Sequence, residues 1–327
     1  MKYFIVTFGC QMNKADSERI AGALEKRGDK RARSVEEADL VVVNMCSVRQ
    51  SAVDRVFGLV PKLKNKKTIL TGCILKKDKR NLAEYFDEII DIKEFIKSGP
   101  KYSEKTRAFV PIMTGCNNFC AYCVVPYTRG RENSRPAKEI IREVKNLVRR
   151  GFKEIWLLGQ NVNSYQYNFP QLLRKINKIQ GKFWIRFTSP HPKDFSDDLI
   201  KAMAECKKVA KYLNLPVQSG DDKILKKMNR SYTIAQYKNL VKKIRKKIPD
   251  INLSTDVIVG FPGETKRQFE NTAKLFKEIK YDIAYIAKYS PRPGTAAAKM
   301  KDNVSLKEKK RREKVLREIL NKKSHQG

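Results

Sequence analysis

The chain has 327 residues, enough for two ordinary domains, and 41% of them are hydrophobic, as in a globular protein. Lysine and arginine number 70 against 35 acidic residues, a formal net charge of +35, which favours a polyanionic partner such as nucleic acid; a lysine-rich genome is the alternative source of this charge. No hydrophobic run is long enough to cross a bilayer and the N-terminus does not resemble a signal peptide, so we expect a cytoplasmic protein with no membrane partner.

Residues 1–97 are predicted to form an N-terminal domain. Short runs rich in β-branched residues predict strands at 2–8, 39–44 and 67–72, and amphipathic patterns near 15–27 and 50–63 predict helices between them. This βαβαβ order favours a small parallel sheet with crossover helices. A polar linker at 98–107 then begins with Gly99 and Pro100.

A second strand and helix alternation covers residues 108–298. Its predicted strands lie at 108–113, 154–158, 183–188, 211–217, 251–260 and 281–289, and the first helix opens at Pro136 after Ser134. Six such units are too few for a closed eight-stranded barrel, so we expect an α/β fold with an open, partial (βα)6 barrel. Residues 299–327 form a basic helical tail that is either solvated or in contact with nucleic acid.

Seven cysteines in a chain without an export signal argue against a disulfide framework and for thiolates that hold metal or do chemistry. Cys116, Cys120 and Cys123 form a CxxxCxxC pattern just after the first strand of the second domain, where the active sites of such folds lie. Zinc is one alternative, but its cysteine sites favour two CxxC pairs. Three thiolates can instead hold a [4Fe-4S] cluster and leave one iron open.

This CxxxCxxC motif, with aromatic Tyr122 before its last cysteine, resembles the radical S-adenosylmethionine (SAM) enzymes. The resemblance implies that the open iron is chelated by SAM and that the reduced cluster cleaves SAM to a 5′-deoxyadenosyl radical. The protein would then position the cofactor against its substrate and exclude water and oxygen.

Three further cysteines, Cys10, Cys46 and Cys73, each lie at or just beyond the end of a predicted strand of the first domain. Because parallel strands end at one edge of their sheet, we expect these cysteines to converge on one site. Taken singly, each could be a buried structural cysteine. Cys206 has no such partner and is expected to pack within a helix.

Two three-cysteine sites of this kind closely resemble the radical SAM methylthiotransferases, and the overlap runs from FGCQMN to YSPRPGT. The resemblance implies a second, auxiliary [4Fe-4S] cluster on Cys10, Cys46 and Cys73. The segments CVVPYTRGRENSRP and LLGQNVNSY, with Asn161, are similar to the branch that methylthiolates C2 of N6-isopentenyladenosine at tRNA position 37. Alternatives with the same chemistry are threonylcarbamoyl-adenosine or a ribosomal-protein aspartate, and a non-enzymatic iron-sulfur RNA-binding or electron-transfer protein is an alternative of another class.

Polar residues and glycines at the predicted strand ends suggest a cradle for SAM. The candidates are Gly159, Gln160, Gln218, Asp256, Gly260 and Glu264, together with Tyr122. The competing interpretation is that they are turn residues and helix caps. The candidates for RNA contacts are Arg129, Arg131, Arg135 and Arg230.

The family resemblance further implies tRNA as the partner and flavodoxin or ferredoxin as the electron donor, and we expect a monomer. The C-terminal RNA-binding β-barrel domain usual in this family is not expected in the present chain, which ends at Gly327. We expect the basic tail to replace part of that contact, so that tRNA binding weakens steeply with salt.

Overall fold

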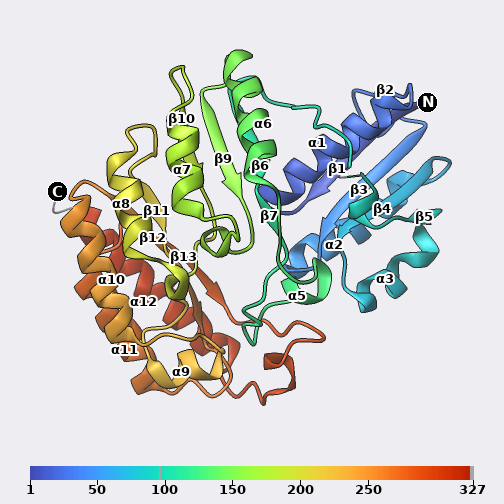
Figure 1. Ribbon diagram of the computed structural model, residues 1–327. Coiled ribbons are helices and arrows are strands. Elements are labelled where there is room, and N and C mark those ends of the chain that lie inside the picture. The colour runs from blue at the N-terminus through green and yellow to red at the C-terminus, as the bar shows by residue number, and fades with distance from the viewer. Residues whose placement is uncertain (96, 325–327) are drawn as a thin grey trace.

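Two sets of parallel strands, one in each half of the chain, organise the structure (Figure 1). The computed structural model describes residues 1–95 and 97–324. The alternation of strands and helices predicted from the sequence is present in both halves, and the α/β class is confirmed. None of the described helices is both long and apolar enough to span a membrane.

The N-terminal sheet has five parallel strands in the order β2-β1-β3-β4-β5. Its strands are β1 (Lys2–Phe8), β2 (Lys30–Arg31), β3 (Leu40–Cys46), β4 (Lys67–Cys73) and β5 (Glu88–Ile89). The two short edge strands were not predicted, since two residues carry too little pattern. Every residue of β3 is buried, as expected for a central strand covered by helices on both faces.

Helices cover both faces of this sheet, and the side chains of β3 divide between them by the two-residue period of a strand. Leu40 and Val42 pack with α1 (Gln11–Lys26) and α4 (Ile92–Phe95). Val41 and Val43 pack on the other face, in a cluster that includes residues of the remaining helices. Those helices are α2 (Gln50–Leu59), η1 (Val60–Leu63) and α3 (Lys76–Leu82), and the short η2 (Ala83–Tyr85) follows α3 without contributing to the cluster.

The second half forms an open, partial barrel of six parallel strands. These are β6 (Arg107–Pro111), β9 (Glu154–Leu158), β10 (Trp184–Phe187), β11 (Tyr212–Asn214), β12 (Asn252–Val259) and β13 (Ile283–Lys288). They pair as β10-β9-β6 and β11-β12-β13. A parallel bridge between Ile185 and Val209 joins the two halves of the barrel. The expected strand at 211–217 is shorter than predicted, because its second half leaves the ladder near Pro216.

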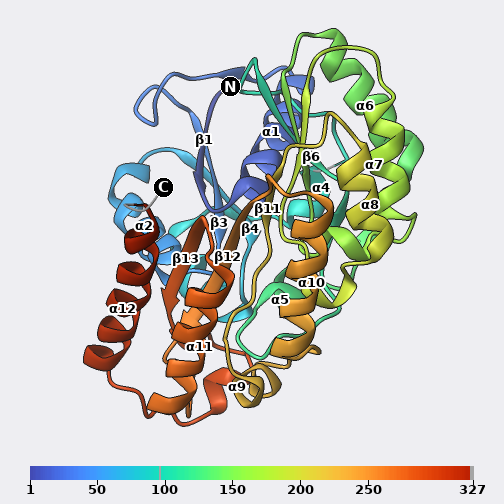
Figure 2. The ribbon, with the colours of Figure 1, turned by 90° about the vertical axis from the view of Figure 1, so that its left-hand side faces the viewer.

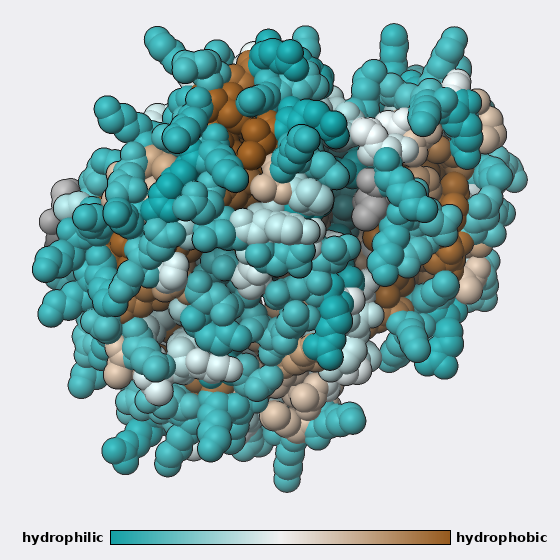
Figure 3. All heavy atoms as spheres, in the orientation of Figure 1, coloured by the Kyte–Doolittle hydropathy of each residue, from teal (hydrophilic) through white to brown (hydrophobic). Residues whose placement is uncertain are grey.

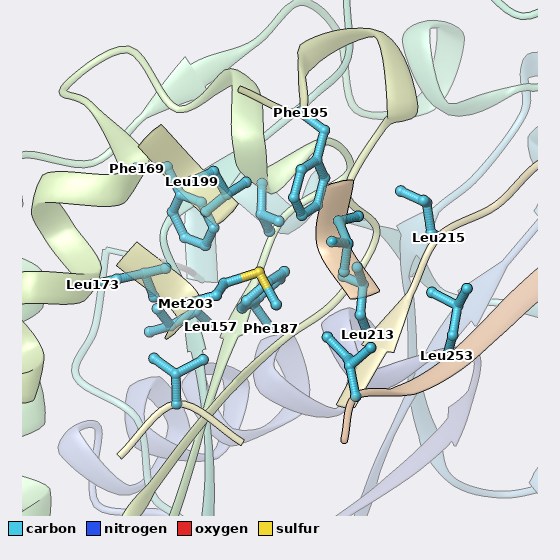
Figure 4. Close-up of a cluster of buried hydrophobic side chains, with 14 of the residues drawn as sticks. Leu157, Phe169, Leu173, Phe187, Phe195, Leu199, Met203, Leu213, Leu215 and Leu253 are labelled. Carbon is cyan, nitrogen blue, oxygen red and sulfur yellow. The ribbon is translucent and has the colours of Figure 1, made fainter. Parts of the chain in front are cut away.

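The barrel helices lie outside the strands and close a large apolar core. They are α6 (Ala137–Arg149), α7 (Phe169–Asn177), α8 (Asp197–Glu205), α9 (Asp222–Lys227), α10 (Ile234–Lys247) and α11 (Lys266–Ile279). Figure 4 shows part of this core, where Phe187 and Leu213 of the strands meet Phe169 and Met203 of the helices. The outer face in Figure 3 is largely hydrophilic, with apolar residues in narrow strips.

Short elements connect the barrel strands at their carboxyl ends. They are β7 (Met113–Thr114), α5 (Val125–Thr128), β8 (Asn133–Ser134), η3 (Val162–Ser164), η4 (Pro192–Asp194) and η5 (Ala297–Lys299). The predicted linker does not run free. Glu18 of α1 accepts hydrogen bonds from Lys101 and Ser103, and the Tyr102 hydroxyl donates to Glu143 of α6 at 2.7 Å. The linker therefore fastens α1 to α6.

The basic tail forms α12 (Leu306–Ser324), and the predicted residues 325–327 lie outside the described part of the chain. The helix is not solvated on all sides, because it packs on β13 and α11, as Figure 2 shows. Leu316 is fully buried, and Arg312 forms a buried ion pair with Glu264 at 2.6 Å. One face of the tail is thus part of the barrel.

Replacing Arg312 with alanine is expected to lower the free energy of unfolding by roughly 3 to 5 kcal/mol, since it leaves the Glu264 carboxylate buried without its cation. Urea denaturation of the purified protein measures this. Lys314→Ala on the exposed face of α12 is the matched control and should leave the midpoint unchanged. Equal stability of the two variants would show that α12 does not depend on this ion pair.

Candidate active site

The cysteine-bearing segments of both domains meet where their parallel strands end. Cys46 and Cys73 are the last residues of β3 and β4, and they are direct partners in the strand register. Cys10 follows β1 and is the N-cap residue of α1. The structure therefore places the three cysteines of the first domain at one edge of one sheet, as their positions in the sequence predict.

Asn13 on the first turn of α1 lies between Cys10 and Cys73. Its side-chain oxygen accepts from the Cys10 amide at 3.2 Å, and its Nδ2 donates to the Met45 carbonyl at 3.2 Å and lies 3.9 Å from the Cys73 Sγ. A hydrogen bond between Cys46 and Cys73 lowers the pKa of Cys46, and the same bond together with burial raises the pKa of Cys73. The pair thus forms one thiolate more easily than two.

An arginine from the second domain reaches this site. Arg129, which ends α5, donates from Nε to the Cys73 Sγ at 2.8 Å and from Nη2 to Asp16 of α1 at 2.6 Å. Arg129 and Asp16 are both buried. The expectation that Arg129 contacts RNA is therefore corrected, because its guanidinium is turned inward and shared between Cys73 and Asp16.

The CxxxCxxC loop lies between β7 and α5, at the centre of Figure 1. Gly115 opens the loop with φ +82°, and a Cβ there would lie 2.0 Å from the Arg131 carbonyl oxygen, so only glycine fits. The Gly115 amide donates to the Gln160 side chain at 2.6 Å. Gln160, expected to contact SAM, thus also holds the cysteine loop on the end of β9.

The three thiols of this loop are half-buried and influence one another electrostatically. Burial raises the pKa of Cys116 and raises that of Cys123 to about 12. Among the described residues, no three histidine, cysteine, aspartate or glutamate side chains stand close enough to hold a single metal ion. A set of three soft sulfur donors on one loop fits an iron-sulfur cluster.

A second buried arginine lies beside this loop. Arg230 has its Nη1 3.6 Å from the Cys120 Sγ and donates to the Pro216 carbonyl at 2.8 Å and to the Tyr232 hydroxyl at 3.0 Å. It is 8% exposed, so the expectation of an RNA contact is corrected here too. In both cases a cationic donor approaches a cysteine sulfur of a candidate cluster site.

His191, for which the sequence predicted no role, packs edge to face against Tyr232 with ring centroids 5.7 Å apart. Burial, followed by the charges of Arg230 and Lys193, lowers its pKa to about 2, so the imidazole is neutral. Its Nε2 is buried and has no hydrogen-bond partner among the described residues. A neutral histidine nitrogen is therefore available near the Cys120 loop.

Two of the cradle candidates have side chains or backbone free for a cofactor. Gln218 adopts φ +68° while its backbone bonds to Asp256 and Ile258 of β12, which leaves its side chain out of the strand ladder. The Asp256 carboxylate accepts from Asn214 at 2.7 Å, and burial raises its pKa against the opposing charges of Arg49 and Arg230. Tyr122 is packed in an apolar cluster that includes Met228.

The other cradle candidates serve the fold. Gly159 has no room for a Cβ, which would lie 2.6 Å from Met113. Gly260 has φ +69°, and its amide donates at 2.7 Å to Glu264, whose carboxylate also pairs with Arg312. The Glu264 Oε2 thus already accepts from two partners within the fold.

The two remaining arginines differ in exposure. Arg131 is exposed and lies over the Phe119 ring at 4.4 Å, next to the cysteine loop. Arg135 is half-buried and donates to the Pro111 carbonyl and to Glu143. Of the four predicted RNA contacts, Arg131 alone has an exposed side chain.

Known proteins share both the sequence and the fold. Residues 110–276 match the model of the Radical SAM superfamily, and residues 2–92 match that of the uncharacterized protein family UPF0004. The radical SAM superfamily implies SAM and a [4Fe-4S] cluster. The structure of the radical SAM methyltransferase TsrM from Kitasatospora setae superposes with a TM-score of 0.68 at 14% identity, over 91% of this chain and 77% of that one. The likeness to TsrM concerns the fold alone.

Curated relatives cover nearly the whole chain. The tRNA-2-methylthio-N6-dimethylallyladenosine synthase of Clostridium novyi is 45% identical over 93% of this chain and 77% of its own length. The enzyme of the same name from Carboxydothermus hydrogenoformans is 43% identical over 98% of this chain and 83% of its own length. The chain therefore belongs to the tRNA-2-methylthio-N6-dimethylallyladenosine synthase family within the radical SAM superfamily.

Proposed function

We propose that this protein transfers a methylthio group to C2 of N6-isopentenyladenosine at position 37 of tRNA, with SAM and two [4Fe-4S] clusters as cofactors. The observation that carries the proposal is the hydrogen bond from Arg129 to Cys73 at 2.8 Å. Arg129 lies six residues after Cys123, so this bond fastens the CxxxCxxC loop to the second set of three cysteines. An enzyme that uses both sets in one reaction needs them held together.

In this proposal Cys116, Cys120 and Cys123 hold the cluster that binds SAM, and Cys10, Cys46 and Cys73 hold the auxiliary one. A cluster held by the first set would supply the electron that cleaves SAM, and one held by the second set would serve sulfur delivery. The chain's own contribution is placement, with domains at residues 1–97 and 108–298. Gln160 holds the cysteine loop against β9, and Gln218 and Asp256 would contact the cofactor.

Arg129 and Arg230 act on the electronic properties of the two sites. Each brings a buried cationic N–H group to a cysteine sulfur. Such hydrogen bonds stabilise the reduced, more negative form of a cluster and so raise its reduction potential. The two arginines therefore fit a tuning role better than the RNA contact predicted from the sequence.

The substrate tRNA accounts for the charge of the protein. A formal +35 attracts a polyanion over long distances, and most of the lysines lie on the surface. We place the reaction in the cytoplasm, with a monomeric enzyme and an electron donor of the flavodoxin or ferredoxin type. One SAM supplies the methyl group and another supplies the radical.

Cysteine variants separate the two sites. In the reconstituted protein, Cys120→Ala is expected to abolish both 5′-deoxyadenosine formation and methylthiolation, because the SAM site is lost. Cys46→Ala should keep 5′-deoxyadenosine formation and lose only the methylthio product, measured by nucleoside mass spectrometry of isopentenylated tRNA. Cys206→Ala, away from both sites, is the control. Formation of 5′-deoxyadenosine by wild-type protein without methylthio-isopentenyladenosine would contradict the substrate assignment.

Two arginines two positions apart in the sequence, Arg129 and Arg131, test the tuning role. Arg129→Gln is expected to lower the reduction potential of the auxiliary cluster, since it removes a charged donor from Cys73. Arg131→Gln, which changes the same charge at an exposed position, should leave that potential unchanged and weaken tRNA binding. Redox titration followed by electron paramagnetic resonance gives the potentials. An unchanged potential in Arg129→Gln would exclude the role proposed for this residue.

Deletion of residues 299–327 is not a clean test of RNA binding, because it also removes buried Leu316 and Arg312. Substitution of the exposed Lys307, Lys310 and Lys314 by glutamine keeps that face intact. We expect weaker tRNA binding and a salt dependence shallower by up to about 0.9 per lost phosphate contact, measured by filter binding. Lys242, Lys246 and Lys247 of α10, exposed and equal in charge, form the control set. Equal effects of both sets would assign binding to net charge alone.

A further inference from the structure

A cavity of about 730 Å³ lies at the seam between the two domains, lined by α1, the linker, β7, α5 and α6. Along α6 it extends from Glu139 to Arg149, which at 1.5 Å per residue is roughly 15 Å. Its volume lies within the range of about 300 to 1,000 Å³ that is typical of small-molecule sites. None of the six candidate cluster cysteines lines it.

A buried arginine with a free donor faces this cavity. Arg19 of α1 is 6% exposed, and its Nη1 has no hydrogen-bond partner among the described residues. Its Nη2 is 3.6 Å from Glu143, but that carboxylate already accepts from Tyr102 and Arg135 at 2.7 Å each. A guanidinium buried without full pairing is costly, so an anion in the cavity would stabilise it.

Further cations line the same cavity without partners. Arg142 and Arg149 of α6 form no ion pair or side-chain hydrogen bond among the described residues, and Lys93 lies across from them. The acidic groups are Asp16, Asp91, Glu139 and Glu143, of which Asp16 and Glu143 are engaged by arginines. The unpaired charge that faces the cavity is therefore mainly positive.

The rest of the lining is apolar. Met12, Ile92, Pro100, Pro111 and Met113 contribute to the wall. Apolar walls with a few converging charged groups are typical of sites for organic ligands. We propose that this seam cavity binds a small organic anion, with its phosphate or carboxylate group on Arg19 and its planar or apolar body between α1 and α6. The inference stands apart from the proposed function, because it uses neither cluster nor tRNA.

Isothermal titration calorimetry on the full-length reconstituted protein tests the proposal, with SAM present to fill its own site. AMP carries a phosphate on a planar body, and benzoate carries a carboxylate on one. Adenosine lacks the acidic group and inorganic phosphate lacks the planar body, so these two are the matched control probes. We expect AMP or benzoate to bind at least tenfold more tightly than either incomplete probe. Binding of AMP would identify the acidic group of the ligand as a phosphate, and binding of benzoate would identify it as a carboxylate. No saturable binding of AMP or benzoate would overturn the proposal.

Substitutions locate the binding. Arg19→Gln is expected to weaken it by roughly tenfold to a hundredfold, as for loss of a charge-assisted hydrogen bond. Arg27→Gln changes the same charge at the end of the same helix, outside the cavity, and should bind normally. Asn146→Trp, at an exposed position of α6 on the cavity wall, fills the space without altering the core and should abolish binding. Binding that survives both Arg19→Gln and Asn146→Trp would place the ligand elsewhere and refute the assignment.

Discussion

The contact of Arg129 with Cys73 and Asp16 is the constraint on which the arrangement of the two domains depends. A guanidinium removed from water must be compensated by partners of good geometry, and here both partners belong to the other domain. If the domains separated, Arg129, Cys73 and Asp16 would lose these partners and would either stay buried without them or become exposed to water. The linker adds a second fastening, through Glu18 on one side and Glu143 on the other. The relative position of the two cysteine sites is therefore specified by charges and not by apolar packing alone.

Much of this architecture could be predicted from the sequence, because the relevant patterns are local. Runs such as DLVVVN and EIWLL combine β-branched or large apolar residues with polar flanks, and the strands formed within one or two residues of them. The convergence of Cys46 and Cys73 followed from topology, since parallel strands end at one edge. Errors arose where a local pattern is weak, as in the two-residue strands β2 and β5, or where a proline ends a ladder early.

The roles of charged residues could not be predicted in the same way. Arg129, Arg131, Arg135 and Arg230 look alike in the sequence, yet one is exposed, one is half-buried and two are buried against cysteines. What separates them is which residues elsewhere in the chain fold over each side chain, such as Cys73 and Asp16 for Arg129 and Cys120 for Arg230, and that is long-range information. Glu264 shows the same limit, because its partner Arg312 lies 48 residues later. Whether a charged side chain is buried thus depends on its tertiary partner, and a short sequence motif does not identify that partner.

The electrostatics of the thiols explain why the arginines lie where they do. The hydrogen bond with Cys46 and burial raise the pKa of Cys73, and burial raises that of Cys123, so these two thiols are neutral in the metal-free protein at neutral pH. Metal ligation requires thiolates, and cluster binding must therefore release protons from these sites. Arg129 and Arg230 favour that release, since each places a fixed positive charge beside a sulfur that becomes negative. In the proposed two-cluster protein the same charges would stabilise the added electron, so one pair of buried cations would serve both assembly and reduction.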